Sequence, residues 1–178
     1  MKVYFMRHGE SEYNVVRRIN FDPRIKVGLT VKGIDQVNKA AQKFSGMRFD
    51  AIFSSRFLRT KQTAKIMARG RRIRVRTDRR LNEFRTGFEG ENVQVYYDAL
   101  EGAEVLSEFK VDGFESFLDV KLRVYEFLQD LKKKNYARVL IVAHEAVVNA
   151  ARVLFNEISD EDTFVMKVGN TQTFMFDM

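Results

Sequence analysis

The chain of 178 residues contains only two histidines, and each follows an apolar run that predicts a β-strand. His8 comes after residues 3–6 and Arg7, and His144 comes directly after residues 138–143. In an open α/β sheet, ligands bind at the carboxyl ends of the strands. An imidazole can act there as a nucleophile, a base or a proton donor near neutral pH. One such histidine is usually an ordinary polar residue, but two at the same sheet edge indicate a site for chemistry.

Two arginines share this placement. Arg7 ends the first apolar run, and Arg59 lies near the start of a helical pattern that follows Phe53-Ser54-Ser55. A turn from a strand into a helix offers free backbone N–H groups and the positive end of the helix dipole. Guanidinium groups add bidentate, permanently charged contacts to anionic oxygens. Together these features favour a phosphate group as the ligand.

The same residues lie within motifs that resemble the histidine phosphatase superfamily, which includes the cofactor-dependent phosphoglycerate mutases. Arg7-His8-Gly9-Glu10-Ser11 resembles its signature, and residues 54–64 resemble its Ser-Ser-x-Leu-x-Arg-Ala-x-Gln-Thr-Ala stretch. The remaining matches follow in the family's order: Asn14, Gly28-Leu29-Thr30 with Gly33 and Gln36, Leu81-Asn82-Glu83 with residues 87–90, residues 113–116 with Arg123, and Val142-Ala143-His144. The likeness spans nearly the whole chain.

The resemblance implies that His8 is the nucleophile and forms a phosphohistidine. Its attacking nitrogen must be unprotonated, so the other ring nitrogen should donate to a backbone carbonyl in the Gly9 turn. Gly9 has no side chain, which lets the backbone approach the phosphate closely. Asn14 falls where the family has a phosphate-contacting asparagine. His8, Gly9 and Asn14 are therefore expected on the first strand and the turn after it.

The resemblance also implies how charge and protons are handled. Arg7, Arg59 and His144 would hold the three equatorial phosphoryl oxygens in the transition state. Glu83 would protonate the leaving oxygen and then activate water against the phosphohistidine. Because cationic side chains do this work, and no carboxylate–histidine metal cluster is visible, we expect neither a metal nor a cofactor.

One position departs from the family's pattern. The residue after the second histidine is usually glycine, and here it is Glu145. A carboxylate beside a phosphate repels it, so Glu145 is expected to point away along its helix. Other carboxylates, including Glu89, are expected at the solvated surface.

Alternation of short apolar runs with helical patterns predicts a three-layer α/β/α fold of the phosphoglycerate mutase type. It has a mostly parallel central sheet with helices on both faces. The strands are expected at residues 3–6, 50–54, 72–76, 138–143 and 174–178. The helices are expected at residues 30–46 with Thr30 as the N-cap, 56–68, 114–134 and 145–155. Residues 91–110 have weak periodicity and are expected to be partly loop over the site.

The amino-acid composition indicates which class of protein the chain belongs to. The chain is 45% hydrophobic and has no cysteine, which fits one globular domain over residues 1–178 without disulfides or thiolate metal sites. No apolar run is long enough for a membrane span and no signal peptide is visible, so a cytoplasmic protein without a membrane partner is expected. The net charge is +7, with much of the excess in the arginines of residues 69–80. That stretch has no aromatic residue to stack on bases, so a solvated edge strand is favoured over a nucleic-acid surface.

Three functions remain open at this stage. The first is a phosphomonoester hydrolase, metal-independent and of the acid type, acting on a small phosphorylated metabolite. The second is a mutase-type phosphotransferase, which the short interval from Glu83 to His144 disfavours, because family mutases carry a longer insertion there. The third is a non-catalytic binder of a phospholigand or nucleic acid. The sequence leaves a homodimer and the identity of the substrate open.

Overall fold

The computed structural model describes residues 1–178, built around one five-stranded sheet in the order β3-β2-β4-β1-β5. The strands are β1 (Lys2–Arg7), β2 (Ala51–Ser54), β3 (Val75–Thr77), β4 (Arg138–Ala143) and β5 (Thr173–Asp177). β1, β2, β3 and β4 are mutually parallel, and β5 runs antiparallel to β1. This sheet confirms the expected mostly parallel architecture.

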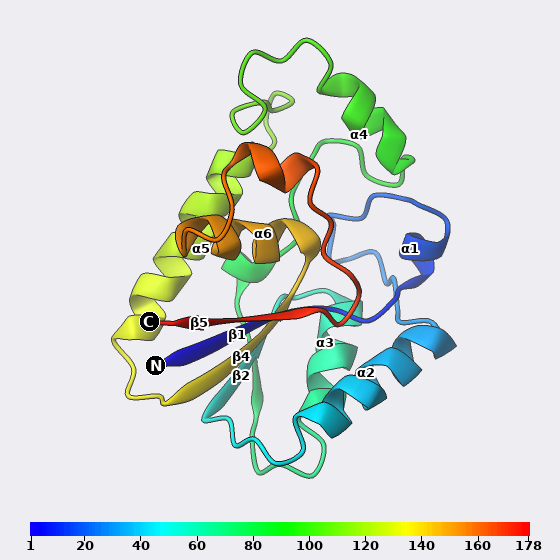
Figure 1. Cartoon of the computed structure of the whole chain (residues 1–178). Helices are drawn as coiled ribbons and strands as arrows, with labels where there is room; N and C mark the ends of the chain where they lie inside the picture. Colours follow the sequence, from blue (N-terminus) through cyan, green and yellow to red (C-terminus); the bar gives the residue numbers. More distant parts are fainter.

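Helices cover both faces of the sheet, as Figure 1 shows. One face packs against α2 (Val31–Lys43) and α3 (Leu58–Met67), and the other packs against α5 (Phe117–Lys132) and α6 (Glu145–Leu154). The central strand β4 is buried from Val139 to Ala143, which explains its continuous apolar run. Side chains of its two faces belong to the two separate cores, so the predicted three layers are confirmed.

Four short elements complete the structure. They are α1 (Glu12–Val15), α4 (Val93–Ala99) and the 3₁₀ turns η1 (Arg79–Leu81) and η2 (Glu161–Phe164). Of the weakly periodic residues 91–110, only α4 is a regular helix, and Figure 1 shows this region extending away from the sheet. No helix of the structure is long and apolar enough to cross a membrane.

Two elements begin three residues later than predicted, for local reasons. The third strand was expected at residues 72–76, but only Val75–Thr77 pairs with β2. The segment before it is held elsewhere, because the Arg71 guanidinium donates to the carbonyl oxygens of Phe44 and Met47. The helix expected from residue 114 begins at Phe117, because Ser116 is its N-cap and forms a capping box with Asp119.

The arginine-rich stretch serves the fold at three of its positions. Arg71 ties the chain to the end of α2, Arg80 pairs with Asp78 and Asp130, and Arg76 donates to the hydroxyl of Tyr136. β3 is an edge strand of the sheet, as expected. These contacts support the solvated-edge interpretation of residues 69–80.

Two glycines let α2 lie directly against the turn that follows β1. A Cβ on Gly33 would lie 2.0 Å from the carbonyl oxygen of Glu10, and one on Gly9 would lie 2.6 Å from the carbonyl oxygen of Gly33. Both clashes involve backbone, which cannot simply rotate away. The position of the turn after His8 therefore depends on glycine at both sites.

Gly33→Ala is expected to destabilise the protein by about 1–3 kcal/mol, the usual range for overpacking. Urea unfolding of the variant measures this loss. Gly46→Ala is the matched control, because a Cβ at Gly46 would meet nothing within 4 Å. Equal unfolding midpoints for the two variants would contradict the close approach of α2 to the turn.

Candidate active site

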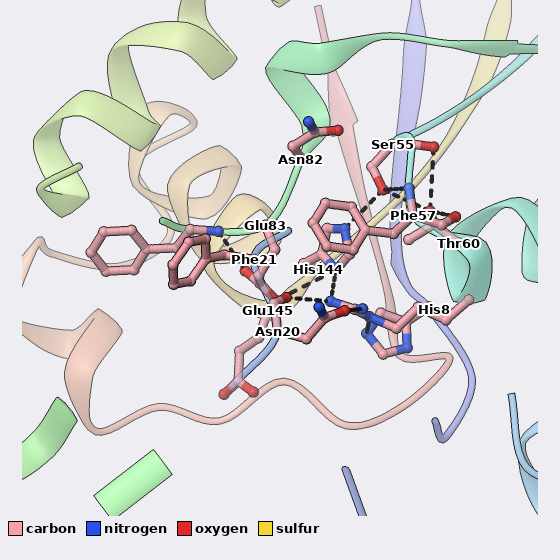
Figure 2. A network of polar contacts seen from close by, with 12 residues as sticks. His8, Asn20, Phe21, Ser55, Phe57, Thr60, Asn82, Glu83, His144 and Glu145 are labelled. Atoms are coloured by element: carbon pink, nitrogen blue, oxygen red, sulfur yellow. Dashed lines mark hydrogen bonds and ion pairs between the residues drawn. The ribbon is translucent and has the colours of Figure 1, made fainter. Parts of the chain in front are cut away.

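A cavity of about 480 Å³ opens at the carboxyl ends of the parallel strands. Its wall includes Arg7 and His8 from β1 and the turn after it, Arg59 from α3, and Glu83 from the segment after η1. His144, the N-cap of α6, lies beside His8, with their ring centroids 5.3 Å apart. The structure thus brings together the five residues that were predicted to be catalytic, and Figure 2 shows His8, Glu83 and His144 among them.

His8 is held with one ring nitrogen committed to the backbone. Its side chain is buried, and Nδ1 lies 2.7 Å from the carbonyl oxygen of Gly9. A carbonyl only accepts, so Nδ1 carries the proton and Nε2 keeps its lone pair. Burial, followed by the charges of Arg59 and Arg7, holds the pKa of His8 well below its ordinary value. The predicted hydrogen bond in the Gly9 turn is confirmed, and the ring is neutral, as a nucleophile requires.

Arg59 contacts both histidines. Its Nε donates to Nε2 of His8 at 3.1 Å, and its Nη2 lies 3.2 Å from Nδ1 of His144. The guanidinium also stacks on the ring of Phe57, 4.6 Å from the ring centroid. Burial lowers the pKa of Arg59 to about 10, so the group stays charged at neutral pH. A fixed cation is therefore in place against the unprotonated Nε2 of His8.

Arg7 contributes a second cation with a free donor. Its Nη1 forms an ion pair with Oε2 of Glu145 at 3.0 Å and also donates to the carbonyl oxygen of Val168. Its Nε is buried and has no hydrogen-bond partner. A buried unpaired donor is costly unless a ligand satisfies it. Arg7 lines the same cavity as His8, so this orphaned N–H is a candidate donor for a phosphoryl oxygen.

Glu83 is placed to handle a proton. Its Oε2 lies 3.4 Å from Nδ1 of His144, and its Oε1 accepts from the backbone N–H of Phe84 at 2.9 Å. Arg123, itself paired with Glu115, donates to the carbonyl oxygen of Glu83 at 3.3 Å and fixes the backbone there. Burial raises the pKa of the Glu83 carboxyl, against the opposing charge of Arg59. The carboxyl is thus biased toward the protonated form that a general acid needs.

Asn14 lines the cavity, as predicted, but its side-chain oxygen is already used. Oδ1 accepts from the N–H of Ser11 at 3.0 Å and from Nδ2 of Asn170 at 3.2 Å. Only its Nδ2 remains for a ligand. Asn170 also donates to the carbonyl oxygen of His8 at 3.1 Å, so it braces the nucleophile's turn from the far end of the chain. The sequence gives no signal for this contact, because the two residues are 162 positions apart.

A second contact missed from the sequence fixes Arg59. Its guanidinium donates to the side-chain and backbone oxygens of Asn20, and Nδ2 of Asn20 donates to Glu89 at 3.0 Å. Glu89 also accepts from the N–H groups of Phe21 and Asp22. Glu89 is therefore not a solvated surface carboxylate but the anchor of the loop that orients Arg59. The one sequence feature that could have indicated this role is the Gly-Phe-Glu-Gly motif that contains Glu89.

The prediction for Glu145 was wrong. Instead of pointing away along α6, its carboxylate pairs with Arg7, accepts from the N–H of Val168 at 3.3 Å, and lines the cavity. The negative charge is tolerated there because it meets both a guanidinium and the positive end of α6. This carboxylate partly neutralises the charge that Arg7 offers to a ligand.

Glu145→Gln is expected to strengthen inhibition by orthophosphate about fivefold. The change keeps the side-chain shape but removes a repulsive charge worth about 1 kcal/mol at the separations and screening of a solvated cavity. The inhibition constant of orthophosphate, measured for both proteins at one pH and ionic strength, gives the effect. Weaker inhibition in the variant would mean that the carboxylate chiefly orients Arg7.

Comparisons with known proteins agree with this geometry. The model of the histidine phosphatase superfamily (branch 1) matches residues 3–178. A 2,3-bisphosphoglycerate-dependent phosphoglycerate mutase of Thermoplasma acidophilum is 28% identical over 181 residues, covering 100% of this chain and 88% of the relative.

Two solved structures share the whole fold. YhfR of Bacillus stearothermophilus superposes with a TM-score of 0.87 at 25% identity, covering 99% of this chain and 90% of the other. A phosphoserine phosphatase of Entamoeba histolytica, solved with 3-phosphoglyceric acid, gives a TM-score of 0.82 at 26% identity, with the same coverages. The match of the family model over nearly all residues settles the assignment: the chain belongs to branch 1 of the histidine phosphatase superfamily.

Proposed function

We propose that the whole chain forms one catalytic domain that hydrolyses small phosphomonoesters through a phosphohistidine on His8. The observation that carries the proposal is the state of the His8 ring. Nδ1 is committed to the carbonyl oxygen of Gly9, and Nε2 keeps a lone pair toward the buried Arg59 and the cavity. A neutral imidazole fixed in this tautomer is the form that attacks phosphorus.

The proposed reaction has two steps. When substrate binds, Arg59 turns its Nε–H from Nε2 of His8 to the phosphoryl oxygens, which frees the lone pair of Nε2. Nε2 then attacks phosphorus while the ester P–O bond breaks, and the Glu83 carboxyl gives its proton to the departing oxygen. Arg59, the free Nε–H of Arg7 and His144 take the phosphoryl oxygens. In the second step the Glu83 carboxylate removes a proton from water, which attacks the phosphohistidine. Orthophosphate leaves, and both Glu83 and His8 return to their starting states.

We propose that the reaction needs no metal ion. Arg7 and Arg59 supply two positive charges next to the nucleophile, which is the role a metal takes in other phosphoryl transfers. Around them, Arg17, Arg18 and Lys167 line the outer part of the cavity. These side chains favour a substrate that is anionic as a whole.

The test is a panel of phosphomonoesters that includes phosphoserine, 3-phosphoglycerate and an aryl phosphate. Release of orthophosphate is measured with and without EDTA. We expect turnover on at least one small phosphomonoester, unchanged by the chelator. No release from any of them would contradict the proposal, and loss of turnover in EDTA would contradict metal independence.

A mutase is the second candidate, since a relative over the whole chain bears that name. The matched experiment supplies 3-phosphoglycerate with 2,3-bisphosphoglycerate and follows isomer interconversion against orthophosphate release. Hydrolysis is expected to dominate, because the interval from Glu83 to His144 is short and the cavity is open to water. Rapid interconversion with negligible hydrolysis would overturn this preference.

A further inference from the structure

The buried hydroxyl groups of Ser55 and Thr60 lie beside Nε2 of His144, and neither residue lines the cavity. Ser55 Oγ lies 2.8 Å from Nε2 of His144 and 2.6 Å from Oγ1 of Thr60. Thr60 in turn donates to the carbonyl oxygen of Phe57 at 3.0 Å. None of Ser55, Thr60 and His144 is exposed at all. Figure 2 shows this row of contacts running from the ring of His144 into the start of α3.

The partners of His144 determine where its proton lies. Nδ1 faces Nη2 of Arg59 at 3.2 Å and Oε2 of Glu83 at 3.4 Å. A guanidinium can only donate, and the protonated form of the Glu83 carboxyl, which burial favours, donates as well, so Nδ1 is the acceptor. Burial and the charge of Arg59 keep the ring neutral. Its single proton is therefore on Nε2, where it is donated to Ser55 Oγ. Ser55 then donates to Thr60, and Thr60 donates to Phe57, so every donor in the row has an acceptor.

His8 has the reverse arrangement, because the carbonyl oxygen of Gly9 accepts from its Nδ1. We propose that Ser55, supported by Thr60, is a positioning residue that holds His144 as its Nε2–H tautomer, so that the two histidines of the site carry their protons on opposite ring nitrogens. Ser55 lies in the Ser-Ser-x-Leu-x-Arg stretch, and neither step of the proposed reaction uses it directly. Its neighbour Ser54 is equally buried and donates only to the carbonyl oxygen of Ser55.

The effect of this tautomer on catalysis, but not the tautomer itself, rests on the proposed function. An unprotonated phosphoryl oxygen only accepts, so a phosphoryl group in the cavity requires a proton on Nδ1 of His144. A phosphomonoester that binds as its monoanion supplies this proton, and Nε2 keeps its own. During that change the ring has to keep its plane and position. The Ser55 hydroxyl accepts from Nε2 before and after it, so it retains the ring in both states. Van der Waals contact with Phe57, 4.8 Å between ring centroids, does not distinguish the two ring nitrogens.

Nitrogen-15 NMR of histidine-labelled protein tests the tautomers directly, because the chain has only two imidazoles. We expect one ring protonated at Nδ1 and one at Nε2 at neutral pH. His8→Gln removes one set of resonances and assigns the other to His144. A remaining ring that is protonated at Nδ1, or at both nitrogens, would overturn the inference.

Ser55→Ala tests the positioning role, with Ser54→Ala as the matched loss of a buried hydroxyl. Partners that orient a metal-bound histidine are worth about 10- to 100-fold in activity. We expect a loss of that size in kcat for Ser55→Ala, with KM little changed and with a mixture of His144 tautomers. Ser54→Ala is expected to keep the activity and the spectrum of the wild type. Wild-type kcat and an unchanged spectrum in Ser55→Ala would overturn the role.

Thr60 provides an independent arm if Ser55→Ala fails to fold. Thr60→Val removes the hydroxyl with little change in shape and is expected to shift the Nε2 resonance of His144 and lower kcat, whereas Thr60→Ser is expected to restore both. No change in Thr60→Val would contradict the inference. Orthophosphate separates the inference from the proposed function: if it leaves both histidine spectra unchanged, the phosphate site fails, while opposite tautomers in the free protein would still stand.

Discussion

His8→Ala is expected to reduce phosphomonoester turnover by about 10⁴- to 10⁶-fold, the usual cost of removing a covalent nucleophile. No other side chain can replace it. The other imidazole of the site, His144, is held by Ser55 at Nε2, and its Nδ1 is turned toward Arg59 and Glu83. Rapid quench of the wild type with substrate, followed by intact mass measurement, should show one added phosphoryl group. The variant should show none.

His144→Gln is the control for this experiment. It removes a contact to the phosphoryl oxygens but leaves the nucleophile, so turnover should fall while the added phosphoryl group is still detected. A binder without catalysis would show no phosphoryl group on any of the three proteins. Labelling that persists in His8→Ala would contradict the phosphohistidine at this position.

The sequence predicted the parts of the site that are attached to regular elements. His8 and His144 could be placed together because the short apolar runs before them indicate strands, and parallel strands end at one sheet edge. β4 was predicted at its observed bounds, since a strand buried on both faces has an unbroken apolar run. The position of Arg59 could be predicted as well, because α3 begins shortly after β2 and carries the guanidinium to the same sheet edge.

The parts that could not be predicted are contacts between segments without periodicity. Asn20 holds Arg59 and is itself held by Glu89 from a second loop, and Asn170 contacts His8 from the turn before β5. Polar residues in loops have no repeat that fixes their direction, so their partners depend on the folded chain. The contact of Glu145 could not be predicted either. Its repulsion of phosphate was foreseen, but its attraction to Arg7 depends on a distance that no spacing in the sequence encodes.

The two histidines also show why position alone does not define a role. Both rings are buried, neutral and adjacent to Arg59, and they differ in which nitrogen the surrounding structure occupies. The Gly9 carbonyl leaves Nε2 of His8 as the unprotonated nitrogen. Ser55 leaves Nδ1 of His144 as the acceptor. In the proposed mechanism, these backbone and hydroxyl contacts distinguish the nucleophile, His8, from His144, which holds phosphoryl oxygens.

Glu83→Gln is expected to lower kcat/KM for alkyl phosphates by about 10²- to 10⁴-fold, the usual contribution of a general acid. The loss should be much smaller for p-nitrophenyl phosphate, because p-nitrophenolate leaves without protonation. The pH profile should change as well. Burial raises the pKa of Glu83, and the acid acts only when protonated, so wild-type kcat/KM should be highest below that pKa and fall as pH rises through it. In the variant this falling limb should disappear.

Glu115→Gln gives the control for this prediction. It weakens the ion pair that holds Arg123, which fixes the backbone of Glu83, but it leaves the Glu83 carboxyl in place. Its activity should therefore fall modestly and equally for alkyl and aryl phosphates, and the high-pH limb should remain. If Glu83→Gln also affected both substrate classes equally and retained the limb, Glu83 would not be the acid. Protonation of the leaving oxygen would then have to come from another cavity group, and Glu145, which lines the same cavity, is the carboxylate to test first.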